Sequence, residues 1–474
     1  MTWFALVLYA AAAIGLGWLA RSKAESGAAF WTAGRSLGSL SVGLSISAGF
    51  MSVSWSCVYA VQLYYWYGLG AIWLITIPWV ITLAGIWMLT RRYHSLAEFS
   101  QPEMVGRRFG DPARKVVALA LAFVFVVWGG AEIYIAATLL APGLGVSIPV
   151  IIVGISIVVA IYSTMGGFSA VVSTDRMQYA LVAIYVVAMG WLAFRGMSSD
   201  GSRLFPDARV MTFKSGGSWT EVLSPGIPLV AMTLLAYLPG WLFETDLWLR
   251  VQGARDDRSA RRGVVIAIIN ALLFVGVFPM FIGIAALELF PHSGGVSPGI
   301  VGNEGDAIFA ALVTTYAPEW LAGLVALGLI AAAMSTIDTC ANVVGLSMAY
   351  DMLRVHEKEN GDRASRILTV VSMAMLCIFA LNTESLWDIF YLSGGILTTA
   401  VAFPVAAVFI SGASARGVTA SSAFGLIGTV TAYFLGKAGW LAAIEPSWLS
   451  GTGLGYVVWG IVAAVCGYFL GVRH

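Results

Sequence analysis

Residues 328–351 read GLIAAAMSTIDTCANVVGLSMAYD, and this stretch decides the fold class. Most of it is apolar, yet polar residues recur at i, i+3, i+4 and i+7 and so share one helix face: Ser335, Asp338, Thr339 and Asn342. A carboxylate at the centre of a membrane helix costs about 2.5–3.5 kcal/mol on insertion scales, so Asp338 should face a partner or a cavity. Hydroxyls around a carboxylate are hard oxygen ligands for a cation. The alternative is a polar seam that joins helices.

The composition is that of a membrane protein. Of 474 residues, 59% are hydrophobic and 11% are charged, and the mean hydropathy is +0.86, well outside the range of soluble domains. The four cysteines lie in apolar segments without metal-ligand spacing, which argues against a disulfide framework or a zinc site. We therefore predict an all-α polytopic membrane protein.

Thirteen apolar segments are long enough to span a bilayer. We expect them at residues 2–20, 38–62, 67–90, 115–141, 147–165, 173–196, 224–249, 263–289, 319–352, 366–382, 385–411, 418–437 and 452–471. The first segment has no basic region before it and no clear cleavage site after it, so we expect a retained helix. A further short helix is expected near 304–317.

The basic residues lie in alternate loops, including the loop that starts at Arg250. Only five of the 26 Lys and Arg residues fall in the other set of loops: Arg195, Arg203, Arg209, Lys214 and Lys437. The positive-inside rule then places the N-terminus outside and the C-terminus in the cytoplasm. An odd number of helices requires the same arrangement, so we predict a multi-pass cell-membrane protein with this orientation.

Two of the segments look interrupted. Residues 43–56, GLSISAGFMSVSWS, mix serines and glycines into an apolar span and can unwind, which leaves backbone carbonyls free for a cation. In residues 237–246, YLPGWLFETD, the pair Pro239-Gly240 should break the helix and place Glu244 and Asp246 just past the break. The alternative is a plain kink, with Asp246 paired to Arg250 one turn on.

The interruptions begin two blocks of five helices, residues 38–196 and 224–411. Broken segments at matching positions of two halves point to a binding site at the membrane midplane. The sequence contains no P-loop, no nucleophile elbow and no HExxH motif, so we expect neither ATP-driven transport nor an enzyme.

Residues 33–49, AGRSLGSLSVGLSISAG, resemble the opening signature of the sodium/solute symporter family, whose members carry sugars, amino acids and vitamins. Three further stretches match in order: GGFSAVVSTDRMQ at 166–178, AAAMST at 331–336 and MAYDML at 348–353. The resemblance covers nearly the whole chain. It implies one transporter domain over 1–474, with the five-plus-five inverted-repeat fold of the leucine-transporter type. One helix (2–20) would precede the core and two (418–471) would follow it.

The resemblance also implies ion sites. The main sodium site would take carbonyl oxygens from three residues and hydroxyl oxygens from two: Ala48, Met51, Ala332, Ser335 and Thr336. Some relatives have a second sodium site, for which the matching residues are Asp175 and Thr339. Asp338 stands where those relatives have a hydroxyl. Two carboxylates there would hold a second cation or share a proton. The alternative is that Asp175 pairs with Arg176 or a nearby basic loop.

By position in the family, the solute pocket would be lined by Ser54, Trp55, Ile75, Trp241, Glu244 and Phe390. A sugar would find few hydrogen-bond partners there, and a buried hydroxyl without one is costly. Aromatic rings with one acidic group suit a small amine or an amino-acid-like compound, through cation–π contact and a counter-charge. The alternatives are that the rings only pack the core, or that the solute is a small carboxylate or urea.

We therefore predict a sodium-coupled secondary active transporter of a small organic solute, working by alternating access, with Na⁺ as the coupling ion and a monomer as the functional unit. Two other classes stay open. The first is a proton-coupled carrier that uses Asp338 and Asp175. The second is a solute-sensing membrane receptor that acts on a separate partner. A nucleic-acid partner is not expected.

Overall fold

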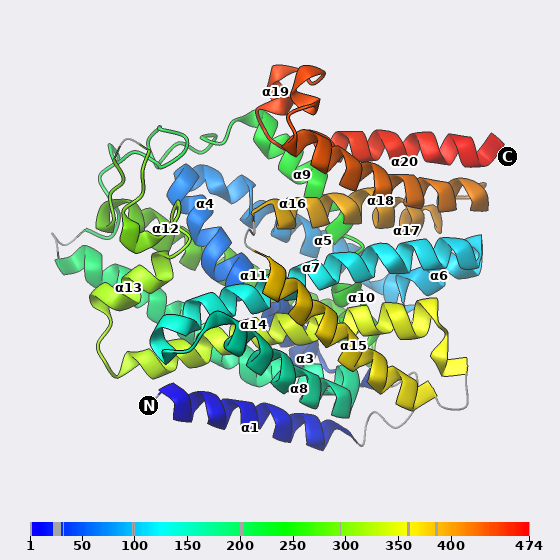
Figure 1. The fold of residues 1–474 in the computed structure, drawn as a ribbon, viewed down its shortest axis with the longest axis horizontal. Coiled ribbons are helices and arrows are strands. Elements are labelled where there is room, and N and C mark those ends of the chain that lie inside the picture. Colours follow the sequence, from blue (N-terminus) through cyan, green and yellow to red (C-terminus); the bar gives the residue numbers. More distant parts are fainter. Residues whose placement is uncertain are drawn as a thin grey trace.

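The computed structural model describes residues 2–21, 30–31, 33–96, 98, 100–199, 203–293, 295–357, 361–383 and 387–473. Over these ranges the chain is helical, with a few isolated β-bridges and no strand. Most helices run along the longest axis, and the two chain ends lie at opposite ends of the bundle (Figure 1). The all-α prediction is confirmed.

The first half of the chain consists of α1 (Thr2–Ala20), α3 (Ser39–Phe50), the π-helical η3 (Val53–Tyr59), α4 (Ala60–Tyr67), η4 (Gly68–Trp73), α5 (Thr76–His94), α6 (Gln101–Phe109), α7 (Asp111–Leu144) and α8 (Ile148–Ser199). The second half consists of α9 (Ile227–Trp241), α10 (Thr245–Gln252), α11 (Asp257–Ala271), η5 (Leu272–Val277), α12 (Phe278–Leu289), α13 (Ile308–Tyr316), α14 (Leu321–Leu346), η7 (Ser347–Met352), α15 (Gly361–Asn382), α16 (Trp387–Ile396), η9 (Leu397–Ala402), α17 (Phe403–Ala407), α18 (Ala415–Lys437), α19 (Ser447–Ser450) and α20 (Gly455–Arg473). The short helix expected near 304–317 is α13.

Fewer separate helices than the thirteen expected spans are long and apolar enough to cross a membrane within the described ranges. Nine helices of the described ranges are long and apolar enough to cross a membrane, and two bent helix pairs raise the number to eleven. One difference arises at α8, which counts once although it contains the predicted spans 147–165 and 173–196 as two helices that meet at a kink at Gly167 (φ 53°). A Cβ at Gly167 would lie 2.2 Å from the carbonyl oxygen of Phe30, so only glycine fits this bend. The other is α5, which is not among the nine.

Both predicted interruptions are confirmed. The helix pair around residues 51–52 bends by 62°, and the pair around residues 242–244 bends by 40°. The expected position of the second break is wrong by a few residues, because α9 continues through Pro239 to Trp241. The reason is a distant side chain. Thr398 of η9 donates to the carbonyl oxygen of Ala236 (2.8 Å) and accepts from the N–H of Gly240 (3.2 Å), which keeps the last turn of α9 intact.

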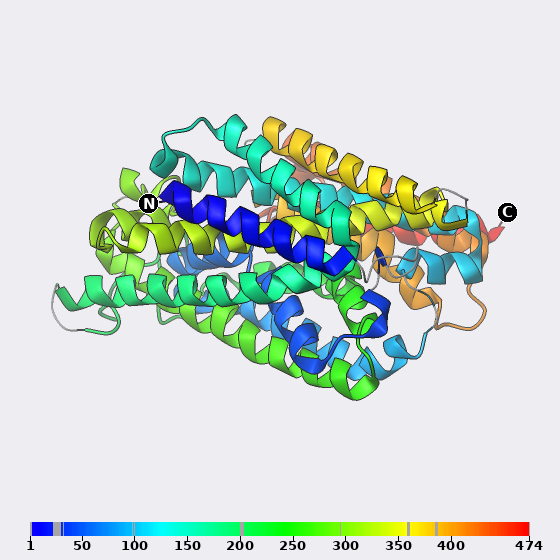
Figure 2. The same cartoon turned by 90° about the horizontal axis from the view of Figure 1, so that it is seen from below.

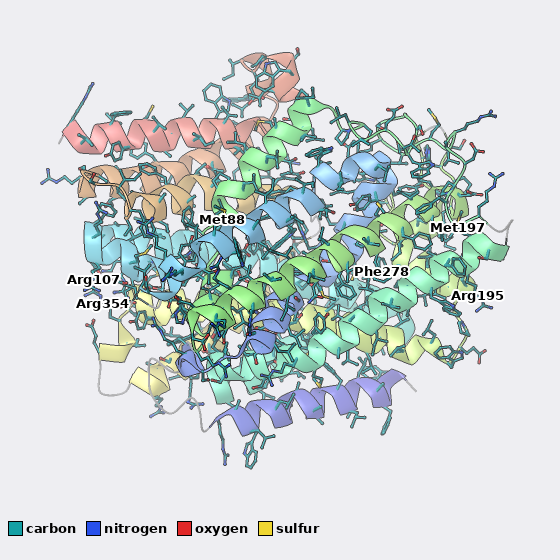
Figure 3. All side chains as sticks on the ribbon, turned by 180° about the vertical axis from the view of Figure 1, so that it is seen from behind. Met88, Arg107, Arg195, Met197, Phe278 and Arg354 are labelled. Atoms are coloured by element: carbon teal, nitrogen blue, oxygen red, sulfur yellow. The ribbon has the colours of Figure 1, made fainter. Side chains whose placement is uncertain are left out.

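The long helix α14 lies inside the bundle and packs against α7 and α8. The outermost elements are α1, which packs on α8, and the α18–α20 pair on the opposite side of the molecule (Figures 1 and 2). Arg107 and Arg354 lie at one end of the bundle and Arg195 lies at the other (Figure 3). At these three positions, the two predicted sets of basic residues lie at opposite ends of the bundle. Which end faces the cytoplasm, and the division into two inverted repeats, remain predictions.

Candidate ion and solute site

The end of α3 and the middle of α14 meet through hydroxyl and carbonyl oxygens. The Ser335 hydroxyl donates to the carbonyl oxygens of Ala48 (3.0 Å) and Ala332 (2.9 Å). The Thr336 hydroxyl donates to the carbonyl oxygen of Gly49 (3.1 Å). The carbonyls of Ala48 and Gly49 are available because α3 ends at Phe50, and the last carbonyls of a helix lack intrahelical partners. The structure thus brings together four of the five residues predicted for the main sodium site.

The fifth predicted ligand, Met51, lies at the break itself. It is fully buried, and its N–H closes the last turn of α3 on the carbonyl oxygen of Ser47 (3.0 Å). The break places carbonyl oxygens beside two hydroxyl oxygens. All of these atoms are oxygen ligands, which is the ligand type that hard cations prefer.

Two of the residues predicted for a second ion site, Asp175 and Thr339, contact the side chain of Arg250. We expected Arg250 in a basic loop. That expectation is wrong, because Arg250 is in α10 with its side chain fully buried. Its guanidinium bonds to Asp175 (3.4 Å), Thr339 (2.8 Å) and Asp246 (3.3 Å). The alternative of an Asp246–Arg250 pair one turn apart is therefore present, and the basic partner of Asp175 is Arg250.

Asp338 is directed toward α8. Its Oδ2 accepts hydrogen bonds from the Tyr162 hydroxyl (2.7 Å) and the Thr174 hydroxyl (3.4 Å). The other oxygen, Oδ1, lies 3.5 Å from the Thr339 hydroxyl. The expectation that a carboxylate on this face of α14 needs polar partners is met by hydroxyl groups of the neighbouring helix.

A cavity of about 70 Å³ lies between the two broken helices. Five of the six predicted pocket residues line it: Ser54, Trp55, Trp241, Glu244 and Phe390. The sixth, Ile75, is buried at the start of α5 and is not among the lining residues, whereas Trp79, one turn further along α5, is. Thr336 also lines the cavity, so it joins the candidate ion site to the solute cavity.

The walls of the cavity are aromatic. Trp55 meets Trp241 and Phe390 edge to face, with ring centroids 5.5 and 5.1 Å apart. Trp241 stacks on Trp79 (4.8 Å) and on Tyr237 (4.4 Å). Such contacts hold the rings rigid and add to the energy of their burial.

The charged groups that line the cavity are acidic, and they lie beside the hydroxyl side chains of Ser52, Ser54 and Thr336. Glu244 and Asp246 line it, and the lining contains no Lys, Arg or His among the described residues. Within the described part of the chain, Glu244 Oε2 and the indole N–H groups of Trp55 and Trp79 are buried without hydrogen-bond partners. A buried polar group without a partner is costly, so these atoms are candidates for bonding a solute.

Glu132, which is not among the site residues predicted from the sequence, lies in α7 and is fully buried. Its carboxylate accepts from the backbone N–H groups of Val53 (2.6 Å) and Ser54 (3.1 Å), and from the Ser54 hydroxyl. These N–H groups begin the helix after the first break, where a negative charge is stabilised by the helix dipole. The signal was present in the sequence, because Glu132 is a lone carboxylate inside the apolar span 115–141.

Comparison with known proteins gives the context of this geometry. The model of the sodium:solute symporter family matches residues 30–431. The chain belongs to the sodium:solute symporter family. The coupling ion of this symporter is Na⁺, and the transporter class inferred from the sequence is confirmed. The family does not by itself identify the solute.

Curated relatives of this symporter transport different solutes. It is 25% identical to a sodium/glucose cotransporter of Vibrio parahaemolyticus over 418 residues, which are 79% of this chain and 73% of that protein. It is 23% identical to a sodium/sialic acid symporter of Aliivibrio fischeri, over 73% of this chain and 69% of that protein. It is 32% identical to the human sodium/iodide cotransporter over 187 residues, which are 38% of this chain and 28% of that protein.

Solved structures confirm the fold. A Na⁺-coupled sialic acid symporter in a substrate-bound outward-open state superposes with a TM-score of 0.76 at 18% identity, covering 100% of this chain and 98% of that one. A nucleobase-cation-symport-1 family transporter gives a TM-score of 0.53 at 16% identity, covering 93% of each chain.

Proposed function

We propose that this symporter couples sodium to the transport of a small amine or amino-acid-like solute, by alternating access. The observation that carries the proposal is the cavity around Trp55, whose aromatic walls enclose Glu244 and contain no basic residue among the described lining residues. Aromatic faces attract organic cations, and the attraction grows when water is excluded. Glu244 supplies the counter-charge.

The unpaired atoms of the cavity support an amino-acid-like solute. Glu244 Oε2 is an acceptor for an ammonium group, and the indole N–H groups of Trp55 and Trp79 are donors for a carboxylate or carbonyl. A volume of about 70 Å³ is small beside the roughly 300–1,000 Å³ of pockets for drug-sized ligands. A compact solute of a few heavy atoms fits better than a sugar with many hydroxyls.

Sodium would act at the junction of α3 and α14. The proposed ligands are the oxygens of Ala48, Met51, Ala332, Ser335 and Thr336, as the sequence analysis expects. A bound cation would order the first break, which begins η3 and carries Trp55 into the cavity. By binding the outward-open state more tightly, sodium would increase the population that can accept solute.

A proton-coupled carrier is the second candidate. Asp338 supports this candidate, because its carboxyl group is fully buried and is hydrogen-bonded to the hydroxyls of Tyr162 and Thr174 rather than to a positively charged side chain. Transport by that mechanism would use a proton gradient in addition to sodium. The uptake experiment below separates the two candidates.

The test uses purified protein in two steps. First, the melting temperature is measured in sodium or potassium chloride with a panel of glycine, proline, choline, glucose and sialic acid. A compound that raises it only in sodium is then assayed, with a radioactive label, for uptake into proteoliposomes. We expect the hit to be an amine or amino acid, and Glu244→Gln to weaken its binding at least about tenfold, equal to about 1.4 kcal/mol.

The matched control is Glu319→Gln, an exposed glutamate outside the cavity, which should behave as wild type. Stabilisation by glucose or sialic acid alone would contradict the proposed solute class. Sodium-dependent uptake that an imposed proton gradient also drives would favour the second candidate.

A further inference from the structure

Arg250 uses every guanidinium nitrogen inside the bundle. Its Nε donates to the Ser45 hydroxyl (2.8 Å), and its Nη1 donates to the backbone carbonyl (3.2 Å) and side-chain Oδ2 (3.3 Å) of Asp246. Its Nη2 donates to Thr339 (2.8 Å) and to Asp175 (3.4 Å). No part of this side chain is exposed. A guanidinium stays charged under all ordinary conditions, so a permanent positive charge is fixed here.

The two residues that the family resemblance assigned to a second sodium ion, Asp175 and Thr339, both bind this guanidinium. The Ser45 hydroxyl, which donates to Asp175, also accepts from Arg250. The side chain therefore connects four elements, namely α3, α8, α10 and α14. Its far side lies against the Phe168 ring, 5.9 Å from the ring centre.

A sodium ion bound to Asp175 and Thr339 would have to lie next to Arg250. Two like charges at contact distance repel, and the repulsion is strong where no water screens it. Sodium would also compete for Asp175 Oδ2 and the Thr339 hydroxyl oxygen, which already accept hydrogen bonds from a charged donor, whereas Asp175 Oδ1 has no partner among the described residues. Asp338 Oδ2 is directed to Tyr162 and Thr174, and its Oδ1 lies 3.5 Å from the Thr339 hydroxyl, which already accepts from Arg250.

We propose that the guanidinium of Arg250 occupies the second cation position of this symporter, so that one sodium ion is coupled to each transport cycle. The proposal rests on the proposed function for its main sodium site at Ser335 and Thr336. The charge on Arg250 belongs to α10, the second half of the second broken helix, and holds that helix to α8 and α14. It therefore attracts the neighbouring carboxylates as a second sodium ion would, and no second sodium ion has to be transported.

The experiment counts bound sodium directly. Equilibrium binding of ²²Na⁺ is measured on purified protein by scintillation proximity, at saturation and in a background of potassium chloride. We expect one ion per chain for wild type, none for Thr336→Ala and one for Asp175→Asn. The matched control for the last variant is Asp207→Asn, an exposed aspartate in a loop, which should also bind one.

Arg250→Met tests the same idea by creating a vacancy. Removal of the guanidinium frees Asp175 and Thr339, and we expect the count to rise to two per chain. Arg250→Lys restores a tethered cation and should return it to one. If Arg250→Met does not fold, the wild-type and Asp175→Asn counts decide alone.

Two ions on wild type, with one lost in Asp175→Asn, would overturn the proposal for Arg250 and leave the proposed function intact. Unchanged binding in Thr336→Ala would instead contradict the main sodium site. The two failures are therefore distinguishable in one set of measurements.

Discussion

Glu132 makes the most specific structural prediction. Its buried carboxylate is the acceptor for the first N–H groups after the break in the first core helix, those of Val53 and Ser54. Glu132→Ala removes this acceptor, and the apolar neighbours have no hydrogen-bonding atoms that could replace it. Glu132→Gln keeps the shape and one carbonyl oxygen, but its amide group faces the second donor.

The magnitude follows from the hydrogen bonds lost. A buried donor left without an acceptor costs about 1–3 kcal/mol, so two such N–H groups cost about 2–6 kcal/mol in Glu132→Ala. The lost interaction with the helix dipole adds about 0.3–1 kcal/mol. Glu132→Gln leaves one donor unpaired and should lose about 1–3 kcal/mol. The order of stability is therefore wild type, then Glu132→Gln, then Glu132→Ala.

The assay is thermal unfolding of purified protein, with Glu319→Ala as an exposed control that should melt as wild type. A double-mutant cycle with Ser54→Ala should show a coupling of at least about 0.5 kcal/mol, because the two side chains are hydrogen-bonded. A melting temperature of Glu132→Ala within about 1 °C of wild type, or strictly additive effects in the cycle, would refute the assigned role.

Three further predictions concern stability and binding. Thr398→Val should cost about 1–3 kcal/mol by removing the bridge to α9, while Thr398→Ser melts close to wild type; equal melting of the two would contradict the bridge. Asp351→Ala leaves the buried guanidinium of Arg114, 3.1 Å away, without its partner and should cost about 3–5 kcal/mol. Replacing both by methionine should recover most of that loss, and no recovery would argue against an unpaired-charge mechanism. Trp55→Ala should weaken solute binding by about 0.5–2 kcal/mol in a titration, and unchanged affinity would exclude a cation–π role.

The parts that sequence reasoning predicted are those set by local pattern. Ser335 and Thr339 lie one turn apart on the expected face of α14, because helical spacing alone decides which residues share a face. The break near Met51 follows from a run of serine and glycine in an apolar span. The five proposed sodium ligands themselves came from the resemblance to the sodium/solute symporter family, which already paired the first broken helix with residues 332–336.

The parts that were missed depend on distant partners. Arg250 looks like the start of a basic loop, and only the bundle shows Asp175, 75 residues away, as its partner. Glu132 and the amides of Val53 and Ser54 are also far apart in the chain. The second break lies beyond Pro239 because of Thr398, which is 158 residues from Gly240. No local pattern encodes such contacts.

The central claim is that sodium binds where Ser335 and Thr336 meet the end of α3. The most direct test is the melting temperature in sodium chloride against potassium chloride at equal ionic strength, for wild type, Thr336→Ala and the exposed control Thr314→Ala. A ligand that binds only the folded state stabilises it by about 2.7 kcal/mol at a hundredfold excess over its Kd. We expect a sodium-specific rise in wild type and Thr314→Ala that is lost in Thr336→Ala. An equal rise in both salts, or a sodium-specific rise that survives in Thr336→Ala, would contradict the assignment.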